Sequence, residues 1–181
     1  MVALIAYRLA ANTLTAARAI ASVLLMVRPS LRLVAFAIAT DWLDGSLARR
    51  GGETSYGARF DLEADSLLTL GTAIAAVRSG APMLALAAPV ARYALVSVRD
   101  PETLSPREVF LDRATGGPLM AVLIAWLAPS RFRALRALTG PVTLARCAAM
   151  GTLATPSAVH SGHSRRPAEP RLVLSTKKED R

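Results

Sequence analysis

The sequence predicts an all-α membrane protein, built as one bundle of six transmembrane helices. Apolar residues make up 52% of the 181 residues, and only 19% are charged. Apolar stretches of about 17–20 residues recur along the chain, which is the length of helix that crosses the ~30 Å hydrocarbon core of a bilayer. Short turns rich in arginine, proline and glycine separate these stretches. We therefore expect residues 1–154 to form a single domain inside a membrane.

The first three predicted helices cover residues 9–27, 31–47 and 60–77. Residues 1–8 are mostly apolar and are interpreted as an interfacial lead-in. Pro29 ends the first helix, because proline lacks the N–H that a continuing helix would need. The third helix contains Gly71 and several alanines, which are small residues that let two helices approach closely.

The last three predicted helices cover residues 81–98, 117–128 and 135–154. The fifth is too short to cross a bilayer by itself. It becomes long enough if it extends back through residues 109–111, which would bury Asp112 and Arg113 as a pair. Pro141 lies inside the sixth helix and predicts a kink there.

The C-terminal segment, residues 155–181, is rich in proline, serine and charge, and predicts a disordered basic tail. The whole chain has a formal net charge of +9, carried almost entirely by arginine. Arginines between apolar segments favour the headgroups of anionic membrane lipids as partners. The low aromatic content, 5%, and the lack of a nucleic-acid-binding motif argue against a nucleic-acid partner.

Four aspartates fall at helical spacing in two neighbouring predicted helices. Asp41 and Asp44 are three residues apart, and Asp61 and Asp65 are four apart, so each pair shares one helix face. The glycine-rich turn at 50–56 predicts an antiparallel hairpin that brings the pairs together. Clustered carboxylates near a bilayer need a compensating cation, and all-oxygen ligands predict Mg²⁺ or Mn²⁺. The competing interpretation is four capping or solvated aspartates.

Positive charge also predicts the orientation of the chain. Counted over the loops, arginine and lysine are more numerous on the side that holds both termini and the aspartates. The positive-inside rule places that side in the cytoplasm. The arginine-rich, lysine-poor composition is typical of a bacterial genome of high GC content. We expect a protein of the bacterial inner (plasma) membrane whose aspartates face the cytoplasm.

The aspartate stretch resembles the signature of the CDP-alcohol phosphatidyltransferase family, D-x2-D-G-x2-A-R-x8-G-x3-D-x3-D. Its fixed positions are filled by Asp41, Asp44, Gly45, Ala48, Arg49, Gly57, Asp61 and Asp65. Seven residues, rather than eight, separate Arg49 from Gly57, and this shortening falls in the turn. The resemblance implies transfer of a phosphatidyl group from a CDP-alcohol, commonly CDP-diacylglycerol, to the hydroxyl of an acceptor alcohol. CMP is the leaving group.

The resemblance also implies roles for single residues. Asp41, Asp44 and Asp61 would hold the metal, and Asp65 would touch the metal and act as the base. The implied nucleotide contacts are Asn12, Thr15, Gly45, Ala48, Arg49 and Thr54. Each has a structural interpretation too, because polar groups in such helices satisfy local carbonyls, small residues pack helices together, and a juxtamembrane arginine reaches toward headgroups.

The acceptor cannot be read from the sequence. The chain is similar to bacterial phosphatidylglycerophosphate and phosphatidylinositol-phosphate synthases, so glycerol 3-phosphate and inositol phosphate are candidates beside serine and other lipids. Arg92, Arg107 and Arg113 are candidates for binding an acceptor phosphate, although Arg92 inside a span also suits pairing with an aspartate. The resemblance implies a homodimer.

Two other classes of function stay open. A non-catalytic protein of the same fold would bind CDP-lipid and metal without turnover. An ion transporter would use the aspartates and the span arginines as a translocation path, but would distribute acidic residues near the middle of the membrane rather than at helix ends.

Overall fold

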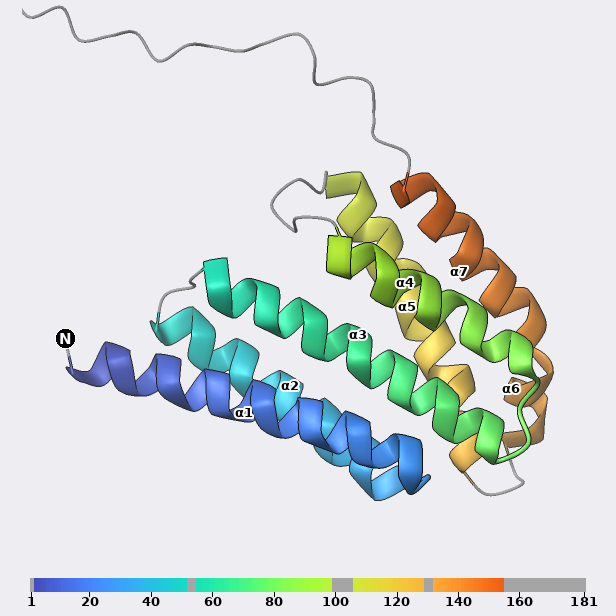
Figure 1. The fold of residues 1–181 in the computed structure, drawn as a ribbon, viewed down its shortest axis with the longest axis horizontal. Helices are drawn as coiled ribbons and strands as arrows, with labels where there is room; N and C mark the ends of the chain where they lie inside the picture. The colour runs from blue at the N-terminus through green and yellow to red at the C-terminus, as the bar shows by residue number, and fades with distance from the viewer. Residues whose placement is uncertain (1, 52–54, 99–105, 129–131, 155–181) are drawn as a thin grey trace, which may run out of the picture.

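The computed structural model describes residues 2–51, 55–98, 106–128 and 132–154, and its regular elements in these ranges are all helices (Figure 1). The predicted all-α class is therefore confirmed. The elements are α1 (Val2–Val27), α2 (Leu31–Gly51), α3 (Ser55–Arg78), the 3₁₀ turn η1 (Met83–Leu86), α4 (Ala87–Val98), α5 (Pro106–Leu127), α6 (Arg133–Ala137) and α7 (Thr139–Ala154). The predicted tail, 155–181, lies outside the described residues.

Helix α3 is central to the arrangement. On one side it packs against α1, which also packs along the whole of α2 (Figure 1). On the other side it packs against α4 and α5, and α7 closes against those two helices. Helices α2 and α3 barely touch each other. The two helices that carry the aspartates run antiparallel, as predicted, but they are bridged by α1 rather than packed against each other.

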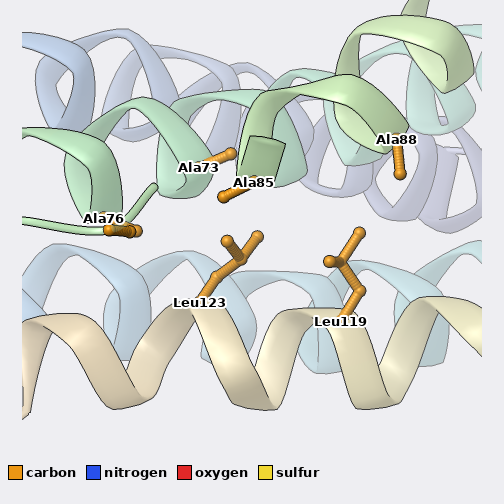
Figure 2. Packing of buried hydrophobic residues seen from close by; sticks show 7 residues of the cluster. Ala73, Ala76, Ala85, Ala88, Leu119 and Leu123 are labelled. Carbon is orange, nitrogen blue, oxygen red and sulfur yellow. The ribbon is translucent and has the colours of Figure 1, made fainter. Parts of the chain in front are cut away.

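Alanines on α3, η1 and α4 form the surface against which α5 packs. Leu119 and Leu123 of α5 point toward Ala73, Ala85 and Ala88, as Figure 2 shows, and all five are fully buried. Because an alanine side chain is a single methyl group, the helix backbones come close together and the leucines fill the space between them.

A glycine allows an equally close approach of α1 and α3. A Cβ atom on Gly71 would lie closer than 3.0 Å to the main-chain oxygen of Ser22, a separation that real Cβ atoms essentially never show. The predicted role of Gly71 in helix contact is thus confirmed. Gly80 ends α3 in the left-handed region, at φ 102°. There the Ala81 N–H donates to the Ala76 carbonyl over 3.0 Å, which satisfies an end group of the helix.

Several predicted boundaries change. Residues 2–8 are continuous with α1 rather than a separate lead-in. Helix α5 begins at Pro106, so the extension through residues 109–111 is confirmed. The predicted pair of Asp112 with Arg113 is wrong, since neighbouring residues on a helix point in different directions. Asp112 instead pairs with Arg92 and Arg146, and Arg113 is exposed.

Prolines explain why two predicted helices are each divided. The predicted helix at 81–98 is split between η1 and α4, and the one at 135–154 between α6 and α7. Pro89 and Pro141 are each the third residue of the second piece. A proline ring conflicts with the carbonyl four residues earlier but is tolerated in the first turn of a helix, so each helix starts again just before it.

Within the described ranges, two helices are long and apolar enough to cross a membrane, judged by length and composition: Ala3–Val27 and Phe110–Leu127. The apolar helix at Met83–Val98 is shorter. Large apolar side chains also point outward from α1, at Leu4, Ile5, Leu9, Ile20, Val23, Leu24 and Val27. An outward apolar face of this extent suits contact with lipid or with another helix. The six-span bundle stays a prediction.

Candidate active site

Arg18 of α1 is the residue around which the four aspartates gather. Its side chain is completely buried. It donates hydrogen bonds to Asp41 of α2 and to Asp61 of α3. Its Nη2 also lies 3.5 Å from Asp44 Oδ2, and its Nη1 lies 3.7 Å from Asp65 Oδ1. One guanidinium group therefore joins the aspartate pairs of two helices that hardly touch.

The aspartates differ in their exposure. The side chain of Asp44 is only 5% exposed, whereas those of the other three are between 43% and 52% exposed. Asp44 accepts a hydrogen bond of 3.0 Å from the hydroxyl of Thr15, which is also buried. The site thus combines one fixed, buried carboxylate with three carboxylates that solvent can reach.

Asp41, Asp44 and Asp61 form a group that we call the aspartate triad. Each offers a carboxylate oxygen, and these three oxygens all lie within 4.8 Å of one another. Hard oxygen donors of this kind suit Mg²⁺ or Mn²⁺. The carboxylates outnumber the single guanidinium among them, so the site keeps negative charge that a divalent cation would neutralise. The residues therefore fit the predicted metal, and ligation by Asp65, which is not in the triad, stays a prediction.

A pocket of about 570 Å³ opens over the triad. This volume is within the range of small-molecule sites in proteins. Beside the triad, it is lined by Trp42, Gly45, Ser46 and Arg113. Trp42, Gly45 and Ser46 share one face of α2, because they are three and four residues apart. The exposed Arg113 comes from α5 and adds a cation to a wall that is otherwise acidic or neutral.

The predicted nucleotide contacts on α1 and α2 have different surroundings. Gly45 lines the pocket. Asn12 and Thr15 are not among the lining residues, although Thr15 reaches the site through its hydrogen bond to Asp44. Asn12 is half-buried, one helical turn before Thr15. Their contacts with a nucleotide stay predictions.

The remaining predicted contacts cannot be placed by side chain. Ala48 and Arg49 belong to the last turn of α2, and their side chains lie outside the described residues. Thr54 lies outside the described residues altogether. The turn before Gly57, which is one residue shorter than in the family signature, also includes residues outside the described ranges.

The three arginines predicted for an acceptor phosphate separate into different environments. Arg113 lines the pocket. Arg107 is exposed near the start of α5 and is not a lining residue. Arg92 is buried and pairs with Asp112, as the alternative interpretation of an arginine within a span predicts.

Sequence reasoning missed Arg18 and the pocket wall at Trp42 as parts of the site. Arg18 carried a signal, since it is an arginine inside an apolar helix and lies three residues after Thr15. A charge within such a helix needs a partner of opposite sign, and these four aspartates are among only 13 acidic residues in the sequence. The position of Trp42 depends on how α2 faces the pocket, which the sequence does not specify.

Among the described residues, three carboxylate oxygens that converge beneath a pocket suit a divalent metal of the kind that enzymes use on phosphate esters. A family model described as CDP-alcohol phosphatidyltransferase matches residues 8–150, and the chain therefore belongs to this family. Comparisons with curated proteins and with solved structures gave no match. Members of the family are membrane proteins that bind a CDP-alcohol and an alcohol acceptor, and they use a divalent metal in catalysis.

Proposed function

We propose that this protein transfers a phosphatidyl group from CDP-diacylglycerol to the hydroxyl of a small or lipid alcohol and releases CMP, as a step of phospholipid synthesis. The observation that carries this proposal is the convergence of three carboxylate oxygens within 4.8 Å of one another, beneath a pocket of about 570 Å³. Membership of the family supports a transferase that acts on a CDP-alcohol.

In the proposed reaction, the acceptor oxygen attacks the phosphorus that carries the diacylglycerol. A new oxygen–phosphorus bond forms as the bond from that phosphorus to the CMP oxygen breaks, and CMP leaves with the electron pair. Asp65 takes the hydroxyl proton, for which its 44% exposure leaves it accessible. Asp41, Asp44 and Asp61, with Asp65 beside them, would hold Mg²⁺ or Mn²⁺. Such an ion, when bound, supplies positive charge to the diphosphate.

The nucleotide would lie along α2 and α1. Gly45 has no side chain, so a ligand can approach the main chain of α2 closely where it lines the pocket. Ala48 would keep the next turn narrow, and Arg49 would bind phosphate through its fork of donors. Asn12, Thr15 and Thr54 complete the proposed contacts, with Thr15 acting through Asp44.

The acceptor would enter from the side of Arg113. This residue is the only arginine among the described residues that line the pocket, and its charge suits an acceptor that carries a phosphate. The proposal therefore favours a phosphorylated alcohol, as in the bacterial phosphatidylglycerophosphate and phosphatidylinositol-phosphate synthases. A replacement of Arg113 by glutamine would raise the KM for such an acceptor more than for serine.

The membrane setting is part of the same proposal. Six spans within residues 1–154 would hold the site at the cytoplasmic face of a bacterial inner membrane, with residues 155–181 as a basic tail. The two long apolar helices and the outward apolar side chains of α1 support a bilayer environment. The proposal includes a homodimer, which the family resemblance implies.

The test is CMP release by the purified protein in lipid nanodiscs, with CDP-diacylglycerol, Mn²⁺ or Mg²⁺ and a panel of acceptors. Asp65→Asn should abolish release, whereas Glu63→Gln should not. Glu63 is a matched control because it lies on the same helix but pairs with Arg59 at 3.1 Å, on the surface. Binding of CDP-diacylglycerol and metal with no CMP release for any acceptor would show a non-catalytic binding protein and overturn the proposed activity.

A further inference from the structure

A second charged cluster lies beside the aspartates and is centred on Asp112 of α5. Arg92 of α4 reaches both oxygens of this carboxylate, with Nε 3.3 Å from Oδ1 and Nη2 3.3 Å from Oδ2. Arg146 of α7 places its Nη2 2.5 Å from Oδ1. Both arginine side chains are at most 8% exposed. Asp112 is therefore the carboxylate that compensates two buried cations on different helices.

Arg92 also connects this cluster to the candidate active site. Its Nη1 donates to the hydroxyl of Ser66 over 3.2 Å, and its Nη2 lies 3.7 Å from Asp65 Oδ2. The other oxygen of Asp65, Oδ1, lies 3.7 Å from Arg18 Nη1. Asp65 thus stands between two guanidinium groups, each within ion-pair range but too distant for a hydrogen bond.

The pairing of Arg92 with Asp112 explains why Arg92 stays 3.7 Å from Asp65 instead of donating a hydrogen bond to it. A guanidinium that donates two hydrogen bonds to one carboxylate is strongly oriented, and here both bonds turn Arg92 toward α5. Without the charge of Asp112, Asp65 would be the remaining carboxylate within ion-pair range of Arg92 among the described residues. A direct hydrogen bond would then draw Asp65 toward α4 and occupy the oxygen that would otherwise accept a proton.

We propose that Asp112 is a positioning residue of the transfer reaction, which holds Arg92 so that Asp65 stays aligned and without a direct arginine hydrogen bond. The inference rests on the proposed function, in which Asp65 takes the proton of the acceptor. Asp112 acts through Arg92 and not by contact with a substrate.

The test compares Asp112→Asn, Arg92→Gln and the double variant in the nanodisc assay. Asparagine keeps the shape of Asp112, and Arg146 still has the Thr115 hydroxyl at 2.6 Å and the main-chain oxygen of residue 112 as acceptors. Asp112→Asn should lower kcat roughly a hundredfold, the typical effect of misplacing a reacting group by about 1 Å, and leave the KM for CDP-diacylglycerol nearly unchanged. Adding Arg92→Gln should recover most of the lost rate, because the competing arginine is gone.

If Asp112 had a purely structural role, adding Arg92→Gln would not recover the kcat lost in Asp112→Asn. Mn²⁺ binding, followed by electron paramagnetic resonance without substrates, should persist in wild type and all three variants, since the three carboxylates of the aspartate triad are untouched and only Asp65 moves. Normal kcat in Asp112→Asn, no recovery in the double variant, or complete loss of Mn²⁺ binding would each overturn the inference. An inactive wild type would instead overturn the proposed function.

A second variant keeps the inference testable if Asp112→Asn does not fold. Arg92→Lys keeps a cation beside Asp65 but cannot donate two parallel hydrogen bonds to Asp112. Its kcat should therefore be lower than that of Arg92→Gln. An Arg92→Lys rate equal to or above the Arg92→Gln rate would overturn the inference.

Discussion

The hydroxyl of Thr15 on α1 donates a hydrogen bond to Asp44 Oδ2 on α2 over 3.0 Å, and both side chains are buried. The same hydroxyl lies 3.1 Å from the carbonyl of Ala11, so its one proton is shared between a charged and a neutral acceptor. This contact joins α1 to α2 at the only well-buried carboxylate of the site. The position of Asp44 is thus set by the packing of two helices.

Replacing Thr15 by valine should destabilise the protein and weaken metal binding. The substitution keeps the branched shape but removes the donor, which leaves the buried Asp44 oxygen without this partner at a cost of about 1–3 kcal/mol. Thr15→Ser, which retains the hydroxyl, is the matched control and should stay near wild type. Thermal unfolding with and without Mn²⁺ measures both effects. Equal unfolding temperatures for the valine and serine variants would contradict this role.

Arg18→Met should make folding depend strongly on a divalent metal. Methionine fills similar space without charge, so Asp41, Asp44 and Asp61 would repel one another without the cation that now lies among them. Removing one member of a buried charge cluster typically costs about 3–5 kcal/mol. Unfolding in EDTA should therefore occur at a much lower temperature than in wild type. Mn²⁺ should raise the unfolding temperature of the variant by more than that of wild type, because the ion takes over the neutralising charge.

The control for this substitution is Arg136→Met. Arg136 is half-buried and donates to the carbonyls of Ala125 and Ala128 over 2.9 and 2.7 Å, away from any of the four aspartates. Its loss should destabilise the fold equally in EDTA and in Mn²⁺. A similar response to metal in both variants would mean that Arg18 has no special relation to the carboxylates.

Gly71→Ala should separate α1 from α3 and disturb the site. The added Cβ would overlap the main-chain oxygen of Ser22, one turn beyond Arg18, and a backbone neighbour cannot turn away as a side chain can. Overpacking of this kind typically costs about 1–3 kcal/mol. Gly117→Ala is the matched control, because a Cβ there meets nothing within 4 Å. It should be neutral or stabilising by up to about 1 kcal/mol, through helix propensity alone. Thermal unfolding of the two variants decides the point.

The arrangement of the four aspartates can be predicted from the sequence because it depends mostly on helix geometry. Spacings of three and four residues place two side chains on one helix face in any helix. The hydrogen-bonding ends of Asp41 and Asp61 meet in the structure for a different reason. They belong to helices that barely touch, and Arg18 on a third helix joins them. Such a contact depends on the packing of α1 between them, which local spacing does not specify.

The ion-pair partners of Asp112 likewise could not be predicted from local sequence spacing. Arg113 is its neighbour in the sequence, but adjacent side chains on a helix diverge, whereas Arg92 and Arg146 approach from α4 and α7. Pro141 predicts an irregularity and its approximate place, since the chemistry of proline is local. The short α6 before it depends on how the chain packs against α5.

Trp42 should report metal binding by its fluorescence. It is 83% exposed, lines the pocket and is adjacent in sequence to Asp41 of the triad. The chain has two tryptophans, so Trp126→Phe leaves Trp42 as the only tryptophan, which can be excited selectively over the tyrosines. Mn²⁺ is paramagnetic and quenches nearby fluorophores, so it should quench this variant. An excess of diamagnetic Mg²⁺ should reverse the quenching by competing for the same carboxylates.

The complementary variant, Trp42→Phe, retains Trp126 and provides the control. Trp126 is not a pocket residue: its indole N–H donates to Thr139 over 3.0 Å, and the Arg136 guanidinium lies 5.2 Å from its ring. Its emission should respond little to Mn²⁺. Asp44→Asn in the Trp126→Phe background should abolish the quenching of Trp42, because a neutral amide is a much weaker ligand than a carboxylate. Quenching that persists in that variant, or that is equal for both tryptophans, would place the ion somewhere other than the aspartate triad.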